Sequence, residues 1–171
     1  RPRIDAERLG RTGEAPVRPC DAPLLDEAGF DRAGNRLFST RLVTADRWVL
    51  DGHRTAAGQA LMPGTGFLEI AAEALREQGE AGPFELCDLY FLRALAVADG
   101  PSASREMRVW LTRSDIGYDF AVQAGLTVGG REGFETNVEG RIALGRVRAP
   151  EMPIDLAAIA ARCRTRPVPD L

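Results

Sequence analysis

One stretch of the chain, residues 65–78, constrains the fold more than any other. Its apolar side chains cover most of the surface of a helix, and only a narrow polar stripe remains. That stripe consists of Glu69, Glu73, Arg76 and Glu77. A helix that is apolar nearly all round is expected to be buried on most sides. Thr65, after Pro63, is the predicted N-cap of this helix, and Gly79 is its predicted stop.

The segments around this helix have the pattern of strands. Residues 37–43 precede it, and the strand candidates after it are residues 84–97, 107–113, 118–123 and 136–144, with Gly140 as a possible bulge. Short connections favour an antiparallel meander. The pattern predicts an α+β hotdog fold, in which a curved antiparallel sheet wraps around one central helix. An unspecified α+β sandwich is the alternative that the pattern leaves open.

Three regions follow from the composition along the chain. Residues 1–36 are rich in Arg, Pro, Gly and Asp and are interpreted as an irregular lead-in segment. Residues 37–148 hold the predicted hotdog. Residues 149–171 contain a short helix, with Asp155 as its N-cap, and are interpreted as a linker toward another module.

Composition excludes several classes of function. The net charge of −3 gives no basic face for nucleic acid, and no apolar run approaches the length needed to cross a membrane. The first residues hold no apolar core of a signal peptide. Three cysteines and one histidine make a disulfide framework or a metal site unexpected, and they favour a cytoplasmic location. The chain has no lysine, so lysine Schiff-base chemistry is excluded.

The only histidine, His53, lies ten residues before Pro63, on a loop that leads to the buried helix. An imidazole, with an ordinary pKa of ~6.5, is suited to exchange protons near neutral pH. Gly58 lets a ligand approach the backbone, and its amide can polarise a carbonyl oxygen. The start of the helix adds a dipole that favours negative charge. These features predict that His53 is a general base in a tunnel roofed by the start of the helix.

The order of these residues resembles a known signature. His53, Gly58 and Pro63, followed by Gly64 and an apolar helix, are similar to the H-x-x-x-G-x-x-x-x-P motif of polyketide synthase and fatty-acid synthase dehydratase domains. Weaker likeness extends over most of residues 20–165. Two spacings depart from the family. His53 precedes Gly58 by five residues instead of four, and the segment from Trp48 to His53 is one residue longer than the family's. We interpret the loop as lengthened on both sides, with the imidazole returned to the same place; altered or lost activity is the alternative.

The resemblance implies a function. The fold would be a double hotdog, and this chain would be its first half. The substrate would be a β-hydroxyacyl thioester on the phosphopantetheine arm of an acyl carrier protein. His53 would remove the α-proton, the amide of Gly58 would hold the carbonyl, and Pro63 and Gly64 would shape the site. No metal or redox cofactor would be needed.

The same resemblance implies partners. They would be the remaining dehydratase half, the neighbouring domains of a multifunctional polyketide synthase in antibiotic biosynthesis, and a second copy in a homodimer. An aspartate beyond Leu171 would protonate the departing hydroxyl, so the chain alone would be inactive. The aspartates present, Asp51, Asp88 and Asp99, do not match the family's acid.

Three other functions remain open. The first is a double-bond isomerase or a cyclase with the same double hotdog. The second is a hotdog thioesterase, which would need a carboxylate on the central helix, such as Glu69 or Glu73. The third is a non-catalytic scaffold with a decayed site.

Overall fold

The computed structural model describes residues 17–100, 103–145 and 154–163. Its main element is a seven-stranded sheet in the order β1-β2-β3-β7-β8-β9-β5, with every neighbouring pair antiparallel. The strands are β1 (Arg18–Pro19), β2 (Glu27–Phe30), β3 (Arg36–Leu42), β5 (Phe84–Phe91), β7 (Arg105–Arg113), β8 (Gly117–Val128) and β9 (Arg131–Leu144). Two short strands, β4 (Ala60–Leu61) and β6 (Ala96–Val97), pair separately.

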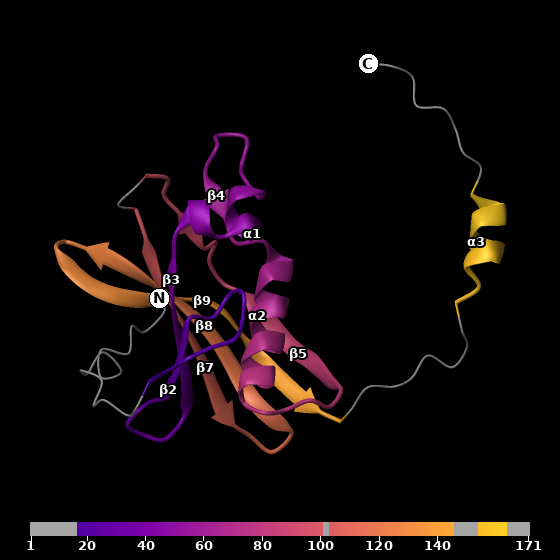
Figure 1. Ribbon diagram of the computed structural model, residues 1–171, viewed down its shortest axis with the longest axis horizontal. Coiled ribbons are helices and arrows are strands. Elements are labelled where there is room, and N and C mark those ends of the chain that lie inside the picture. Colours follow the sequence, from indigo (N-terminus) through magenta and orange to yellow (C-terminus); the bar gives the residue numbers. More distant parts are fainter. Residues whose placement is uncertain (1–16, 101–102, 146–153, 164–171) are drawn as a thin grey trace.

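The long helix α2 (Gly64–Glu77) lies against one face of the curved sheet (Figure 1). Its buried apolar residues include Phe67, Ile70 and Leu75, and they belong to the same core as the inward residues of β7 and β8. Strict alternation in those strands explains this, because successive side chains point to opposite faces of a sheet. The predicted α+β hotdog, with a curved antiparallel sheet around one central helix, is confirmed.

Two details of the central helix differ from the prediction. The helix begins at Gly64, so its N-cap is the extended residue Pro63 and not Thr65. Proline has a fixed φ and no N–H, which suits it to the place where a helix starts. One face of α2 is also open, since Leu68 is 39% exposed, whereas Glu73, predicted on the polar stripe, is buried.

The sheet begins before residue 37. The strands β1 and β2 lie within the predicted lead-in, whose residues 1–16 are outside the described part of the chain. Between these strands, residues 20–26 form a segment that we call the N-terminal strap. Leu24 and Leu25 in the strap are buried in the core, and the backbone N–H of Leu24 donates to Glu73 Oε2 at 2.8 Å. The described part of the lead-in is therefore structural, because it covers α2.

The predicted strand over residues 84–97 splits into β5 and β6. The register between β5 and β9 shifts after Cys87, so that Asp88 and Leu89 together face Gly140. A Cβ at Gly140 would lie 2.9 Å from Leu89 Cδ1 and 3.1 Å from its Cα. The bulge is therefore in β5, and the glycine predicted as a bulge is the residue opposite it.

Two short helices complete the described residues. The helix α1 (Trp48–Asp51) follows a 3-10 turn, Thr44–Asp46, in a segment where no helix was expected. The predicted linker helix is α3 (Leu156–Arg162), and Asp155 caps it by accepting a hydrogen bond from the N–H of Ala158 at 2.9 Å. None of its residues is buried. Among the described residues, no helix combines the length and the apolar character that a membrane crossing requires.

Candidate functional site

The segment between α1 and α2 folds as a short hairpin. Arg54 and Ala60 form a bridge, and the N–H of Thr55 donates to the carbonyl of Gln59 at 2.9 Å. The loop between them turns at Gly58, whose φ of 83° is readily reached only by glycine. We call residues 54–60 the hairpin. It projects from the body of the molecule just before the first turn of α2.

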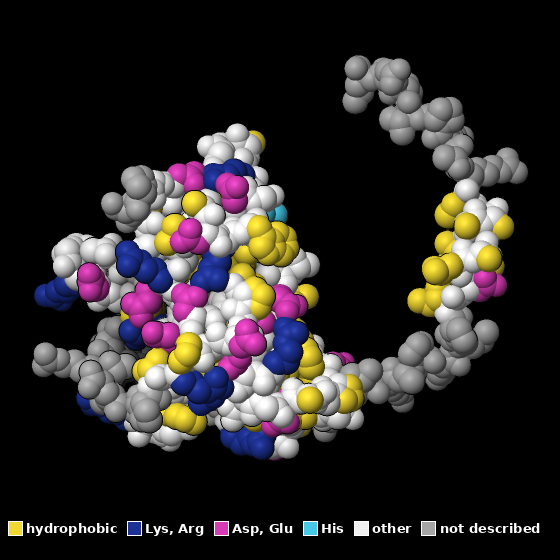
Figure 2. Space-filling view, viewed as in Figure 1, with side chains coloured by type: hydrophobic (Ala, Val, Ile, Leu, Met, Phe, Trp, Pro, Cys, Tyr) yellow, Lys and Arg dark blue, Asp and Glu magenta, His cyan; other side chains and the backbone are white. Residues whose placement is uncertain are grey.

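His53 lies at the base of this hairpin, and its backbone is fixed on both sides. Its N–H donates to the carbonyl of Leu50 at 3.2 Å, and its carbonyl accepts from the N–H of Leu61 at 3.0 Å. The residue is exposed, and its cyan side chain is visible at the surface in Figure 2. No described residue forms a hydrogen bond or an ion pair with the imidazole.

His53 is outside the two hollows that the structure shows most clearly. The structure has a groove of about 660 Å³ on the outer face of the sheet and a smaller hollow of about 560 Å³ beside the hairpin, and His53 lines neither. That the ring projects into a tunnel stays a prediction.

The role predicted for the amide of Gly58 stays a prediction, and in this structure the amide has an acceptor within the turn. Its N–H donates to the carbonyl of Thr55 at 2.8 Å and thereby closes the turn. A substrate carbonyl would have to replace this acceptor to bind the Gly58 amide. No atom lies within 4 Å of a Cβ built at Gly58, so the space beside it is open. Its requirement for glycine comes from the backbone conformation.

Pro63 and Gly64 lie together at the start of α2. Gly64 is exposed, and a Cβ built there would lie 3.6 Å from the ring of Phe91. Phe91 also packs edge-on against Phe67, with ring centroids 6.1 Å apart. The first amides of a helix have no partner within it, so this end of α2 offers donors beside an aromatic surface. The structure thus places the predicted residues in one segment, with His53 before the hairpin and Gly64 after it.

Two of the three candidate aspartates are bound by an arginine that sequence reasoning missed. The guanidinium of Arg54 contacts the carboxylates of both Asp51 and Asp99. Its hydrogen bonds hold the pKa of Asp99 below the ordinary value of 3.8. Both carboxylates are acceptors in this arrangement, which suits neither to donate a proton. A signal was present, since Asp51 and Arg54 have the i, i+3 spacing of a local ion pair.

The carboxylates required by a thioesterase are also engaged. Glu69 is exposed and forms an ion pair with Arg76 at 2.5 Å. Glu73 is 1% exposed and accepts the N–H of Leu24 through Oε2, while its Oε1 has no partner in the described chain. Burial raises the pKa of Glu73 above the ordinary value of 4.5. Glu73 thus serves to hold the N-terminal strap.

Other reactive groups do not form a site in the described residues. No group of three or more His, Cys, Asp or Glu side chains there is placed to hold a metal ion. The three cysteines are unpaired. Burial, with a further contribution from the charge of Glu77, raises the pKa of the Cys20 thiol to about 11, so that this thiol is a poor nucleophile.

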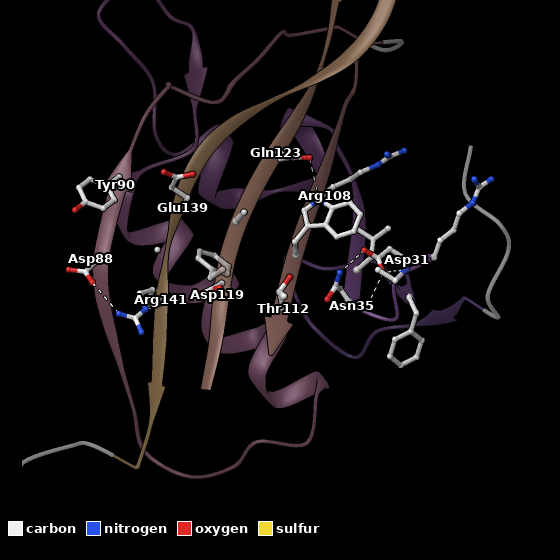
Figure 3. Close-up of a pocket in the computed structure, with 18 residues that line it drawn as sticks. Asp31, Asn35, Asp88, Tyr90, Arg108, Thr112, Asp119, Gln123, Glu139 and Arg141 are labelled. Atoms are coloured by element: carbon white, nitrogen blue, oxygen red, sulfur yellow. Dashed lines mark hydrogen bonds and ion pairs between the residues drawn. The ribbon is translucent and has the colours of Figure 1, made fainter. Parts of the chain in front are cut away.

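The groove on the outer face of the sheet is lined by residues of β3, β7, β8, β9 and β5 (Figure 3). Charges of both signs alternate with polar side chains. Arg141 lies 3.8 Å from Asp88 and 3.9 Å from Asp119, and Trp110 Nε1 donates to Gln123 at 3.2 Å. These groups face one another, and they lie on the side of the sheet opposite α2.

Comparisons with known proteins give the family. Residues 22–125 match the model of the polyketide synthase dehydratase domain, and this range includes His53, Gly58, Pro63 and Gly64. A search of curated proteins returned no match.

Solved structures give the same fold. The dehydratase domain from the CurF module of curacin polyketide synthase is 23% identical, with a TM-score of 0.70 over 85% of this chain and 52% of that chain. A dehydratase structure described for the borrelidin and fluvirucin polyketide synthases is 26% identical, with a TM-score of 0.62 over 88% of this chain and 49% of that one.

A bifunctional dehydratase-cyclase domain in ambruticin biosynthesis is 22% identical, with a TM-score of 0.57 over 75% of this chain and 45% of that one. This chain thus spans about half the length of these solved structures, as one hotdog of a double hotdog does. Because the family model matches more than half of its residues, the chain belongs to the polyketide synthase dehydratase domain family.

Proposed function

We propose that this chain is the half of a dehydratase that supplies the general base for removing water from a β-hydroxyacyl thioester on an acyl carrier protein. The observation that carries the proposal is the position of the only histidine, within the matched range and at the base of the hairpin that leads into α2. The fixed backbone and exposed ring of His53 support it, because a base must reach its substrate.

In the proposed reaction, an imidazole nitrogen of His53 takes the α-proton, and the electron pair of that C–H bond forms the new double bond. The β-hydroxyl leaves as water after it receives a proton from an acid in the other half of the double hotdog. The amides at the start of α2, at Gly64 and Thr65, are suited to the thioester oxygen as negative charge develops on it. The second half would also cover the exposed His53 and form the tunnel.

The proposal extends to the partners. The substrate would arrive on the phosphopantetheine arm of the carrier protein, and the chain would act beside neighbouring synthase domains, as a homodimer in the cytoplasm. Reaction with this chain alone is not expected, because a base without its acid completes only half of the proton transfers.

Turnover of a 3-hydroxyacyl carrier protein tests the function. The assay compares the chain alone with the natural polypeptide that carries it, and mass spectrometry of the carrier detects the loss of water. We expect product only from the longer polypeptide, and a decrease in kcat of about 10²–10⁴-fold for His53→Ala. The matched control is Arg141→Gln, a substitution on the outer face of the sheet, which should leave kcat unchanged.

The products separate the alternatives. A free acid would indicate a thioesterase, and an unchanged turnover with His53→Ala would indicate a scaffold or a different base. A cyclic product would indicate a cyclase, the second candidate function, which the similarity to a dehydratase-cyclase domain favours. Clear dehydration by the isolated chain would contradict the assignment of the acid to the other half.

A further inference from the structure

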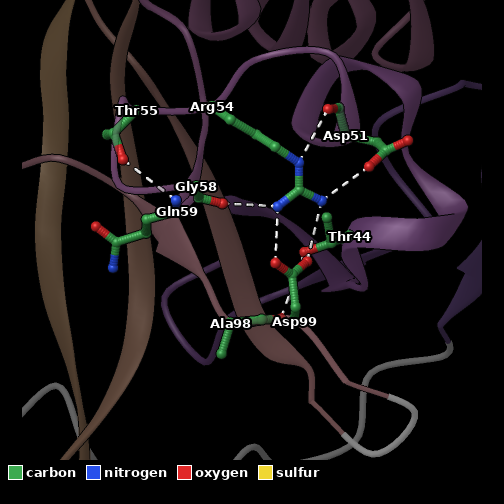
Figure 4. Close-up of polar contacts among 8 residues, drawn as sticks. All are labelled: Thr44, Asp51, Arg54, Thr55, Gly58, Gln59, Ala98 and Asp99. Carbon is green, nitrogen blue, oxygen red and sulfur yellow. Dashed lines mark hydrogen bonds and ion pairs between the residues drawn. The ribbon is translucent and has the colours of Figure 1, made fainter.

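The guanidinium of Arg54 uses all of its hydrogen-bond donors, in the loop around His53 and on Asp99 (Figure 4). Nε donates to the carbonyl of Asp51 at 3.2 Å, and one terminal nitrogen donates to the carboxylate of Asp51 at 2.8 Å. Asp99 accepts from both terminal nitrogens, at 2.7 and 3.0 Å, and the carbonyl of Gly58 accepts at 2.8 Å. An arginine has five N–H donors, and here each has an acceptor.

These contacts join three separate pieces of chain. Asp51 ends α1, Gly58 turns the hairpin, and Asp99 follows β6. A planar guanidinium that binds a carboxylate through two parallel hydrogen bonds sets direction as well as distance. The guanidinium therefore ties the turn of the hairpin to the end of α1 and to the residue two positions after β6.

Stability does not explain such an arrangement. Asp51 and Asp99 are 65% and 57% exposed, and ion pairs between exposed groups contribute little to folding. The pKa of Arg54 is raised and that of Asp99 is lowered by their mutual hydrogen bonds, so both stay charged across the neutral range. What the cluster fixes is geometry.

The fixed element adjoins His53. Arg54 pairs with Ala60 in the hairpin, and successive side chains of an extended segment leave on opposite faces. The Arg54 side chain reaches Asp99, so by this alternation we expect the imidazole of His53 on the other face. In the family motif the histidine precedes the glycine by four residues. In this chain the position four residues before Gly58 is Arg54, next to His53.

We propose that Arg54 is a positioning residue, which orients His53 by locking the lengthened loop to Asp51, Gly58 and Asp99. The inference rests on the proposed function of His53 as the base. It explains how a loop with extra residues on both sides of the histidine keeps a single orientation.

Nuclear magnetic resonance of the chain itself tests the positioning without turnover. The chain has one histidine, so its imidazole signals need no assignment among several. We expect Arg54→Gln to lower the order parameters of the backbone amides of His53 and Gly58, which means increased motion of these amides on the ps–ns timescale. Arg54→Lys should not restore order, because lysine keeps the charge and loses the planar fork. Asp99→Asn should have a smaller effect in the same direction.

Arg141→Gln is the matched control, since Arg141 also contacts several aspartates but lies on the outer face of the sheet. It should leave the motion at His53 unchanged. Thermal unfolding of each variant shows whether the fold is kept; where Arg54→Gln unfolds, Asp99→Asn supplies the measurement. Unchanged motion at His53 in a folded Arg54→Gln or Asp99→Asn variant would overturn the inference.

Kinetics of the natural polypeptide that carries the chain give the second measurement. A misplacement of about 1 Å can cost about 10²-fold in rate. We expect Arg54→Gln to lower kcat by about that factor while KM stays within about twofold, since the substrate's binding surface is left in place. An equal change in KM and no change in kcat would contradict positioning. Absence of turnover in the unsubstituted protein would instead contradict the proposed function and leave the magnetic resonance result to decide this inference.

Discussion

Two segments outside the main sheet, the N-terminal strap and the hairpin, are each held by an arginine, with different consequences. The N-terminal strap, residues 20–26, lies over the later turns of α2, and Arg47 binds both the carbonyl of Pro23 and the carboxylate of Asp26. The hairpin, residues 54–60, precedes the first turn, and Arg54 binds its surroundings in a comparable way. The strap is anchored by buried side chains, whereas the hairpin is exposed.

Burial decides what these hydrogen bonds do. In the strap, Leu24 N–H and Glu73 are out of water, so a lost contact leaves an unsatisfied group in the core. In the hairpin, water can replace any contact that is lost, so stability changes little and orientation changes most. The comparison predicts that substitutions in the strap act on folding and that substitutions around the hairpin act on activity.

Leu25→Ala should have the largest effect on stability. Leu25 is 1% exposed, and removing a buried leucine side chain leaves a cavity that costs about 3 kcal/mol. Urea denaturation followed by circular dichroism measures the loss. A decrease below about 1 kcal/mol would mean that the strap is not part of the cooperative core.

Glu73→Ala should come next, with a loss of about 2 kcal/mol, because the N–H of Leu24 is left buried without an acceptor. Glu73→Gln is the control, since its amide oxygen still accepts that hydrogen bond. Glu69→Ala, at an exposed position of the same helix, should change the free energy of unfolding little. Equal losses in the free energy of unfolding for Glu69→Ala and Glu73→Ala would contradict the conclusion that burial decides the contribution of these carboxylates to stability.

The pH dependence of stability should reveal the charge of Glu73. Burial raises its pKa in the folded protein above the ordinary 4.5, so the folded state binds the proton more tightly. The stability of the unsubstituted chain relative to Glu73→Gln should therefore be highest below pH 4.5 and fall as the pH rises through the raised pKa. This effect should be smaller than that of Glu73→Ala, because the side chain and its hydrogen bond remain. Denaturation at several pH values gives the sign; a rise with pH would contradict it.

Gly58→Ala should cost about 1 kcal/mol. The backbone at Gly58 has a φ of 83°, which a residue with a Cβ adopts at a cost, although nothing lies within 4 Å of the new methyl group. Gly82→Ala is a control at a glycine without positive φ and without a neighbour in contact. The midpoint of thermal unfolding should therefore be lower for Gly58→Ala than for Gly82→Ala.

His53→Gln should have the smallest effect on stability, within about 0.5 kcal/mol, because the ring is exposed and has no recorded partner in the described chain. Dehydration by the natural polypeptide that carries the chain should nevertheless be lost. A stability loss comparable with that of Leu25→Ala would show that the imidazole is a structural group.

Much of the sheet was predictable because its signals are local. The alternation in β7 and β8 and the apolar surface of α2 are properties of neighbouring residues, and they specify strand and helix by period alone. The burial of Glu73 was not predictable in this way. Its partner, the N–H of Leu24, is 49 positions away in the sequence, and a carboxylate on a helix is ordinarily a surface group.

The residues of the candidate site also fall into two groups: those that local spacing identifies and those whose role depends on distant partners. His53, Gly58 and Pro63 were found because their spacing is local, and the structure places them in one segment. The role of Arg54 depends on Asp99, which is 45 positions away, so spacing alone did not reveal it. The hydrogen bond from the Gly58 amide to the carbonyl of Thr55 was also missed, because spacing alone does not specify the conformation of the turn.

The bulge opposite Gly140 determines which side chains of β5 face α2. Before it, the even-numbered residues Phe84 and Leu86 pack against the core; within it, Leu89 does so, and Asp88 is exposed. Without the extra residue of the bulge, the alternation of side chains along β5 would continue unchanged. Asp88 would then point inward, and Phe91 would no longer lie beside the start of α2. Moving the bulge by one position would set a residue with a Cβ where only hydrogen fits. A single missing side chain in β9 thus keeps a carboxylate out of the core and an aromatic ring beside the helix that follows His53.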